Sequence, residues 1–136
     1  MDYDAAAASF QTQGVAELNA IRDSLIAAGL AANRVSVDTA DTEGQDLRCH
    51  LRANRGANSI LLDIELTPVR PPGTVMEVFI SVYLFVNGAQ VVTTFVPSPA
   101  QLYTSLTGMD TMLTKYTAIV GMRPELITKL RTALGV

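Results

Sequence analysis

Residues 47–66 read LRCHLRANRGANSILLDIEL, two alternating runs on either side of Gly56. Apolar residues occupy every second position of each run, which is the period of a strand with one buried face. If the runs pair as a hairpin around Gly56, one register sets apolar residues opposite apolar ones and basic residues opposite acidic ones. The predicted pairs are Leu47 with Leu66, Cys49 with Ile64, Leu51 with Leu62, Arg48 with Glu65 and His50 with Asp63.

Alternating runs also precede and follow this hairpin. Val35 and Val37 begin one run, residues 76–86 form another, and Asn87-Gly88 leads into a third at residues 91–95. Asn-Gly between alternating runs is the strongest short signal for a hairpin. We therefore predict a five-stranded antiparallel meander. The expected pairs of its last three strands are Leu66 with Met76, Ile64 with Val78, Leu62 with Ile80, Leu84 with Val91, Val82 with Thr93 and Ile80 with Phe95.

Helical spacing marks both ends of the chain. A first helix is expected over residues 9–28, closed by Gly29 as a glycine C-cap, with residues 1–8 as a frayed tail or a weak first helical turn. Ser98-Pro99 predicts the start of a second helix that runs to about residue 120, and Pro124 opens a short last helix. The predicted fold class is α+β: one domain over residues 1–136, with an N-terminal helix, the five-stranded meander and two C-terminal helices packed on the sheet.

Composition limits the kinds of protein to consider. The chain has 136 residues, of which 49% are hydrophobic and 17% charged, so that a folded core is expected instead of disorder. A net charge of −3 argues against general binding to nucleic acid, which needs many Lys and Arg residues. With one cysteine, no basic and apolar leader and no apolar stretch of membrane-spanning length, a cytoplasmic protein outside the membrane is expected.

No catalytic motif is recognisable. Cys49 and His50 are neighbours on a strand and should point to opposite faces, so they do not form a nucleophile and base pair. One His and one Cys offer little material for a metal site, and we expect neither metal nor cofactor. No phosphate-binding loop, dinucleotide-binding glycine run or nucleophile elbow occurs. An enzyme with an unfamiliar site stays an open alternative.

Two surface features on the expected sheet are candidate sites. Arg48, Arg52 and Arg55 suggest an anion site, although the predicted pairing with acidic residues explains the same strand as a charge ladder. The second feature is an apolar patch on the face opposite the core, which indicates an interface because such patches rarely stay in water. The candidate interface residues are Leu61, Phe79, Tyr83, Phe85, Val92 and Val96.

Three alternatives remain for what covers this patch: a second copy in a symmetric homodimer, one of the C-terminal helices, or a ligand or foreign partner. We expect a noncatalytic protein-interaction module, adaptor-like or chaperone-like and homodimeric. The first alternative is a small-molecule-binding or enzymatic domain with a pocket between helix and sheet, near Tyr83 and Phe85. The second is single-stranded nucleic-acid binding through the arginines of the strand at residues 47–52.

In size, acidity and order of elements the chain resembles the small dimeric chaperones of bacterial type III secretion. The resemblance implies a dimeric binding protein without catalysis. It departs from their layout between the third and fourth strands, where those chaperones insert a helix and this chain has only residues 70–74.

Overall fold

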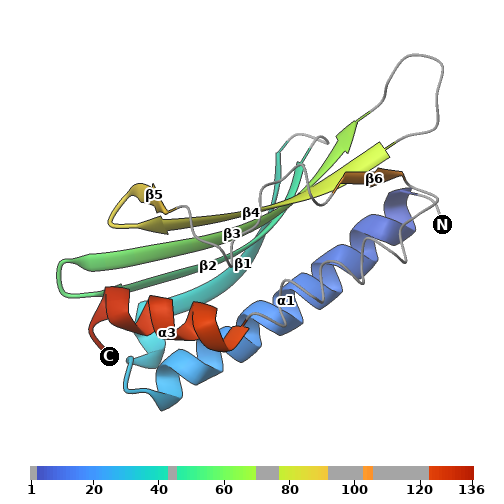
Figure 1. The fold of residues 1–136 in the computed structure, drawn as a ribbon. Coiled ribbons are helices and arrows are strands. Elements are labelled where there is room, and N and C mark those ends of the chain that lie inside the picture. The colour runs from blue at the N-terminus through green and yellow to red at the C-terminus, as the bar shows by residue number, and fades with distance from the viewer. Residues whose placement is uncertain (1–2, 43–45, 70–76, 92–102, 106–122) are drawn as a thin grey trace.

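The computed structural model describes residues 3–42, 46–69, 77–91, 103–105 and 123–136 (Figure 1). Within these ranges the chain has the predicted α+β fold, with an antiparallel sheet in the order β1-β2-β3-β4-β5. A further strand, β6, pairs with β4. The elements are α1 (Tyr3–Ala27), the 3-10 turn η1 (Ala32–Arg34), β1 (Val35–Thr42), β2 (Asp46–Arg55), β3 (Asn58–Val69), β4 (Glu77–Val86), β5 (Ala89–Val91), β6 (Tyr103–Ser105) and α3 (Arg123–Leu134).

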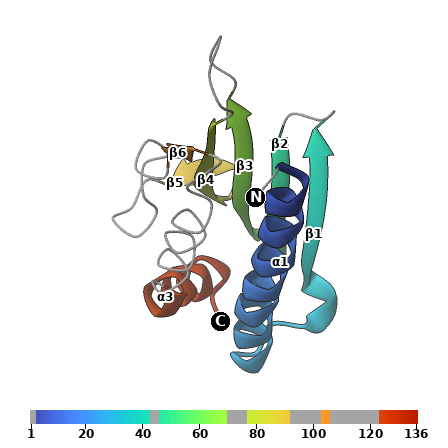
Figure 2. The ribbon, with the colours of Figure 1, turned by 90° about the vertical axis from the view of Figure 1, so that its right-hand side faces the viewer.

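Both described helices lie on the same face of the sheet, which we call the inner face (Figures 1 and 2). Their apolar stripes and the alternate residues of the strands form one core. The largest fully buried side chains are Phe10, Leu18 and Leu25 of α1, Leu51, Leu62, Leu66 and Leu84 of the sheet, and Leu130 of α3.

Helix α1 begins earlier than expected but ends as expected. It starts at Tyr3, so that the segment 3–8 is helical, which agrees with the expected first helical turn and not with a frayed tail. Its run of alanines explains this, since alanine has the highest helix propensity. At the other end, Gly29 has a φ of 116°, and the Leu30 amide donates to the Leu25 carbonyl at 3.1 Å. This is the predicted glycine C-cap, with Leu30 buried beside it.

The hairpin of β2 and β3 has the predicted register, including Arg48 opposite Glu65 and His50 opposite Asp63. Its turn is Gly56-Ala57, and the φ of 60° at Gly56 suits a type II′ turn, which favours glycine at its first central position. The prediction was correct because the apolar face and the charged face of the hairpin both require this register.

The pairing of β3 with β4 differs from the prediction. Leu66 lies opposite Ile80, where the alternation predicted Met76, and the whole strand is shifted by the same four residues. An even shift leaves every side chain on its expected face, so that alternation alone cannot detect it. The connection sets the register, and here β3 continues to Val69 before β4 begins at Glu77.

The Asn87-Gly88 hairpin is confirmed. Both residues have positive φ, 52° and 81°, as a type I′ turn requires, and Leu84 lies opposite Val91 as predicted. Asn87 also joins the turn to β3: its amide donates to the Ser59 carbonyl at 2.9 Å, and its Oδ1 accepts from the Ser59 amide at 2.8 Å. The expected pairings of Thr93 and Phe95 lie outside the described residues.

The predicted helix over residues 98–120 is wrong where it can be compared. Tyr103–Ser105 form β6, opposite residues 77–79 of β4. The rest of the predicted helix lies outside the described residues. The first residues of β4 pair with β6 and its last residues pair with β5. The aromatic Tyr103 and the β-branched Thr104 suit a strand. The last helix, α3, is present as expected, with Leu126, Leu130 and Leu134 buried.

Candidate functional site

The outer face of the sheet, opposite α1 and α3, carries the polar and aromatic side chains that the sequence singled out. Its residues alternate with the buried ones along each strand. The strand register arranges them in rows that run across the sheet. Described outer-face residues are Ser36 and Asp38 of β1, Arg48, His50, Arg52 and Asn54 of β2, Ser59, Leu61, Asp63 and Glu65 of β3, and Tyr83 and Phe85 of β4.

Arg48 is engaged with Glu65 on the neighbouring strand. Arg48 Nε lies 3.0 Å from Glu65 Oε1, with side-chain exposures of 40% and 13%. Nε has no hydrogen bond of good geometry despite this distance, so the contact is an ion pair and not a directed hydrogen bond. A half-exposed cross-strand pair of this kind contributes at most about 1 kcal/mol. The predicted charge ladder therefore accounts for Arg48.

Arg55 is engaged with the end of α3. Its Nη1 donates to the carbonyl oxygen of Gly135 at 2.7 Å and lies 3.4 Å from that of Leu134. Among the described residues Arg52 has no ion pair or hydrogen bond, and its side chain is exposed. The three candidate anion-binding arginines thus point to three environments, and the structure does not bring them together.

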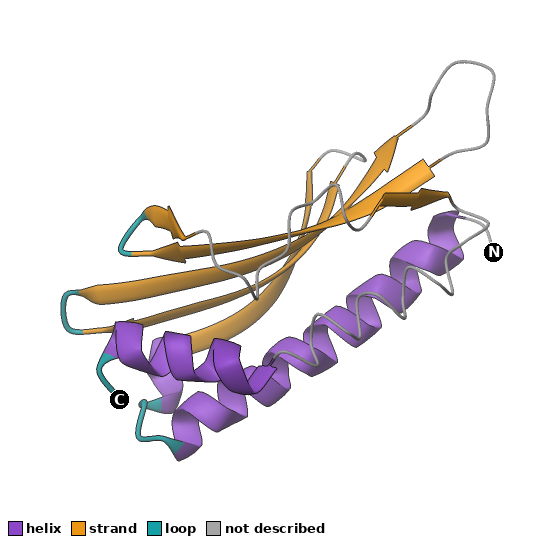
Figure 3. Ribbon diagram, viewed as in Figure 1, coloured by secondary structure: helices purple, strands orange, loops and turns teal. Residues whose placement is uncertain are grey.

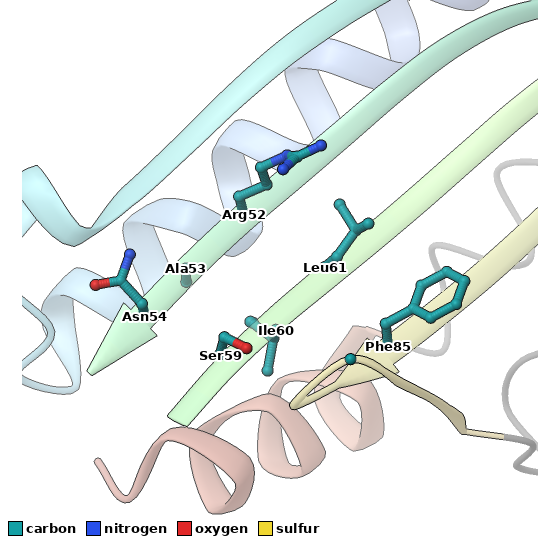
Figure 4. A pocket seen from close by; sticks show the side chains of 8 residues that line it. Arg52, Ala53, Asn54, Ser59, Ile60, Leu61 and Phe85 are labelled. Carbon is teal, nitrogen blue, oxygen red and sulfur yellow. The ribbon is translucent and has the colours of Figure 1, made fainter. Parts of the chain in front are cut away.

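Arg52 belongs instead to a row that runs from Ser36 on β1 to Gln90 on β5. We call its three middle residues the central row: Arg52 on β2, Leu61 on β3 and Phe85 on β4. Figure 4 shows the three side chains rising from adjacent strands. Leu61 and Phe85 are half-buried. The row borders an open hollow of about 360 Å³. The hollow is lined by Arg52, Ala53, Asn54, Ser59, Ile60, Leu61, Phe85 and Gly88.

The neighbouring row, which we call the polar row, is Asp38, His50, Asp63 and Tyr83. Asp63 is only 7% exposed, and its Oδ1 has no hydrogen-bond partner within the described parts of the chain. A buried oxygen without a partner carries a desolvation cost. This carboxylate is the one polar group of the described outer face whose environment the fold itself does not explain.

The described part of the polar row contains no Cys, Ser or Thr side chain. Cys49 lies on the inner face, as predicted, and is fully buried. Burial, together with the nearby charge of Asp63, raises the pKa of its thiol to about 11. A thiol with a raised pKa is a poor nucleophile because little thiolate is present at neutral pH.

The expected interface residues are only partly described. Leu61, Tyr83 and Phe85 are half-buried on the outer face. Phe79 lies opposite Thr67 of β3 and Tyr103 of β6 in the register, and Val92 and Val96 lie outside the described residues. The expected register would have set Tyr83 opposite Ser59, near the hairpin end. The observed one sets Tyr83 opposite Asp63 and Phe85 opposite Leu61, next to Arg52. The sequence did not predict that Phe85 lies in one row with Leu61 and Arg52. The available signal was the Asn87-Gly88 turn, which limits how far β4 can extend.

A second hollow lies between helix and sheet, where the ligand-binding alternative was expected. Its volume is about 170 Å³, and it is lined by Val86, Val91, Lys129, Thr132 and Ala133. Ligand pockets usually have roughly 300–1,000 Å³. The hollow beside the central row falls within that range, and the one under α3 does not.

The described residues contain no group of three or more His, Cys, Asp and Glu side chains that could hold a metal ion. No helix in the described ranges is long and apolar enough to cross a membrane. Comparisons with protein-family models, with curated proteins and with solved structures find no match.

Proposed function

We propose that this chain is a noncatalytic interaction module that pairs with a second copy of itself through the outer face of its sheet. The observation that carries the proposal is the central row, in which an aromatic ring and an arginine without a partner among the described residues flank one leucine. When two copies of this row face each other in opposite directions, each arginine meets the aromatic ring of the other copy.

Several features indicate that the outer face is an interface. Both described helices lie on the inner face, so neither covers Leu61, Tyr83 or Phe85. Half-buried apolar side chains around an open hollow typically mark a binding surface. The flat footprint of β1 to β4 is roughly 600 Å² from usual strand and residue spacings. Side chains add to it, which brings the face near the roughly 800 Å² per partner of a standard interface.

A twofold axis nearly parallel to β3 makes the central row self-complementary. Rotation about this axis keeps the height of each row and exchanges the sides of the sheet. Leu61 of the two copies then meet at the axis, and Arg52 of each copy lies over Phe85 of the other. An arginine over an aromatic face contributes about 0.5–1 kcal/mol at a partly exposed site.

The other face-to-face arrangement is disfavoured by charge. An axis that runs across the strands keeps β2 over β2, so that the basic residues Arg48, His50 and Arg52 oppose one another. Like charges across an interface are unfavourable and act against that orientation. The axis along β3 avoids this contact between basic residues, and its like-charge contact is between the acidic residues of β3, Asp63 among them.

The test is the association state of the wild type beside two matched variants. Leu61→Asp places a charge at the axis, whereas Thr12→Asp adds the same charge to an exposed position on α1, which lies on the inner face of the sheet. Sedimentation equilibrium over a range of concentrations should give twice the chain mass for the wild type and for Thr12→Asp. Leu61→Asp should give a folded monomer, checked by circular dichroism. A wild type that stays monomeric, or a Leu61→Asp variant that dimerises equally well, contradicts the proposal.

The volume of the hollow supports a second candidate, a small-molecule-binding domain. The guanidinium of Arg52, the ring of Phe85 and the amide of Asn54 surround an apolar floor, which suits a flat molecule with an acidic group. Native mass spectrometry of freshly purified protein separates the two candidates. A monomer that carries a bound small molecule supports the second, and a ligand-free dimer rejects it.

A further inference from the structure

Strand β1 forms one edge of the sheet. It pairs with β2 along all eight of its residues, and no other described strand pairs with it. The pairing is regular from Val35 to Thr42 and contains no bulge. Ser36, Asp38, Thr39 and Ala40 are exposed. The outward-facing amides and carbonyls of such a strand can pair with another chain.

The edge lacks most of the features that usually prevent such pairing, and its charged residues are the acidic Asp38 and Asp41 alone. Natural edge strands are protected by proline, lysine, a bulge or very short length. β1 has no proline, lysine or arginine. At the other side of the sheet, β5 and β6 are described over three residues each (Figure 3). Within the described part of the sheet, β1 is the long regular edge.

Charge indicates what would pair there. β1 carries Asp38 and Asp41 and no basic residue. Asp38 is exposed and has no ion pair with any described residue. Pairing β1 with β1 of a second copy would bring two acidic strands together, which is unfavourable, whereas a strand with a basic residue opposite Asp38 would gain a cross-strand pair.

We propose that β1 accepts, by antiparallel strand addition, an extended segment of another protein that carries a basic residue opposite Asp38. Main-chain hydrogen bonds provide most of the affinity, and alternate side chains provide the selection. Val37 is half-buried at the rim of the core, so the residue opposite it is apolar. The inference does not rest on the outer-face dimer, because that interface is centred two strands away.

The experiment uses the full chain and a synthetic nine-residue peptide of alternating Val and Thr with one central Lys. Two matched probes accompany it: the same peptide with a central Glu, and the Lys peptide with N-methyl groups on the amides of one edge, prepared for each edge. Each is titrated against the wild type and Asp38→Lys by fluorescence anisotropy. Because Asp38 is exposed, its substitution should not disturb folding, which circular dichroism verifies.

The wild type should bind the Lys peptide about two- to fivefold more tightly than the Glu peptide, the range expected for one cross-strand charge pair. Asp38→Lys should reverse that preference. N-methylation of the edge that faces β1 should weaken binding at least tenfold, and N-methylation of the other edge should not. The proposal is overturned if the Lys peptide does not bind, or if its preference survives Asp38→Lys. None of these outcomes depends on whether Leu61→Asp gives a monomer.

Discussion

Arg55 at the end of β2 donates a hydrogen bond of 2.7 Å to the carbonyl oxygen of Gly135, just beyond α3. The last carbonyls of a helix have no partner within the helix, and a cation near that end also interacts favourably with the helix dipole. This contact joins the β2–β3 hairpin to a helix that lies almost 80 residues later in the sequence.

Loss of this contact should destabilise the fold. Arg55→Ala is expected to lower the free energy of unfolding by about 1 kcal/mol, since it removes a charged hydrogen bond at a partly exposed helix end. Urea denaturation followed by circular dichroism measures the effect. Lys129→Ala is the matched control, because Lys129 is exposed on α3 and has no ion pair or hydrogen bond with any described residue, and it should change stability by less than about 0.5 kcal/mol. Equal effects of the two substitutions would refute the assigned role of Arg55.

The turn at Asn87 makes a second prediction. Asn87→Ala removes the acceptor of the Ser59 amide and places alanine at a φ of 52°, a region that asparagine tolerates better. The free energy of unfolding should fall by about 1–2 kcal/mol. Asn87→Asp keeps an acceptor oxygen and a residue suited to this φ, and should retain most of the stability. If both variants were equally destabilised, the Oδ1 contact would not be the cause.

Cys49 makes a prediction about pH. The pKa of the folded thiol, about 11, lies above its ordinary value of 9.0, so the folded state holds this proton more tightly than the unfolded state. Its contribution is therefore complete below about pH 9 and is lost as the pH rises toward about 11, an effect on the order of 2 kcal/mol. Urea denaturation between pH 8 and pH 11 should show a smaller decline for Cys49→Ala than for the wild type. Parallel declines would contradict the raised pKa.

Asp63 should oppose the proposed dimer. An axis along β3 that brings Leu61 of the two copies together also brings their Asp63 carboxylates near each other in the next row. Because like charges repel across an interface, Asp63→Asn should strengthen association about fivefold or more, equivalent to about 1 kcal/mol. Sedimentation equilibrium of the variant and the wild type measures the two dissociation constants. Weaker association of Asp63→Asn would argue against this axis.

The hairpin of β2 and β3 was predictable because two independent patterns agreed on one register: Leu51 matched Leu62 and Arg48 matched Glu65. Between β3 and β4 only the apolar alternation was informative, and it is equally satisfied by registers that differ by an even number of residues. The four-residue shift of β4 could therefore not be predicted, and neither could the placement of Arg52 and Phe85 in one row.

At Tyr103–Ser105 a local helical pattern lost to a tertiary effect. Leu102, Leu106 and Met109 have helical spacing in the sequence, yet the residues between the first two pair with β4 as β6. A free segment of sheet edge outweighs a difference in local propensity that is small per residue. The glycine cap at Gly29 was predictable by contrast, since it depends on residues that are neighbours in the sequence, and Gly29 has the positive φ that such a cap requires.

The central claim, a twofold axis at Leu61, is tested most directly by cross-linking variants with one added cysteine by a short bifunctional maleimide. Packed sheets lie about 10 Å apart, so in Leu61→Cys the two thiols should be within reach of a reagent of about that length. In Ser36→Cys the paired positions would be displaced sideways by a further ~19 Å, four strand spacings, and should not react together. Cys49 should stay unmodified because it is buried and its pKa is raised. The account predicts a cross-linked dimer for Leu61→Cys and almost none for Ser36→Cys; equal yields, or no dimer from Leu61→Cys, would contradict it.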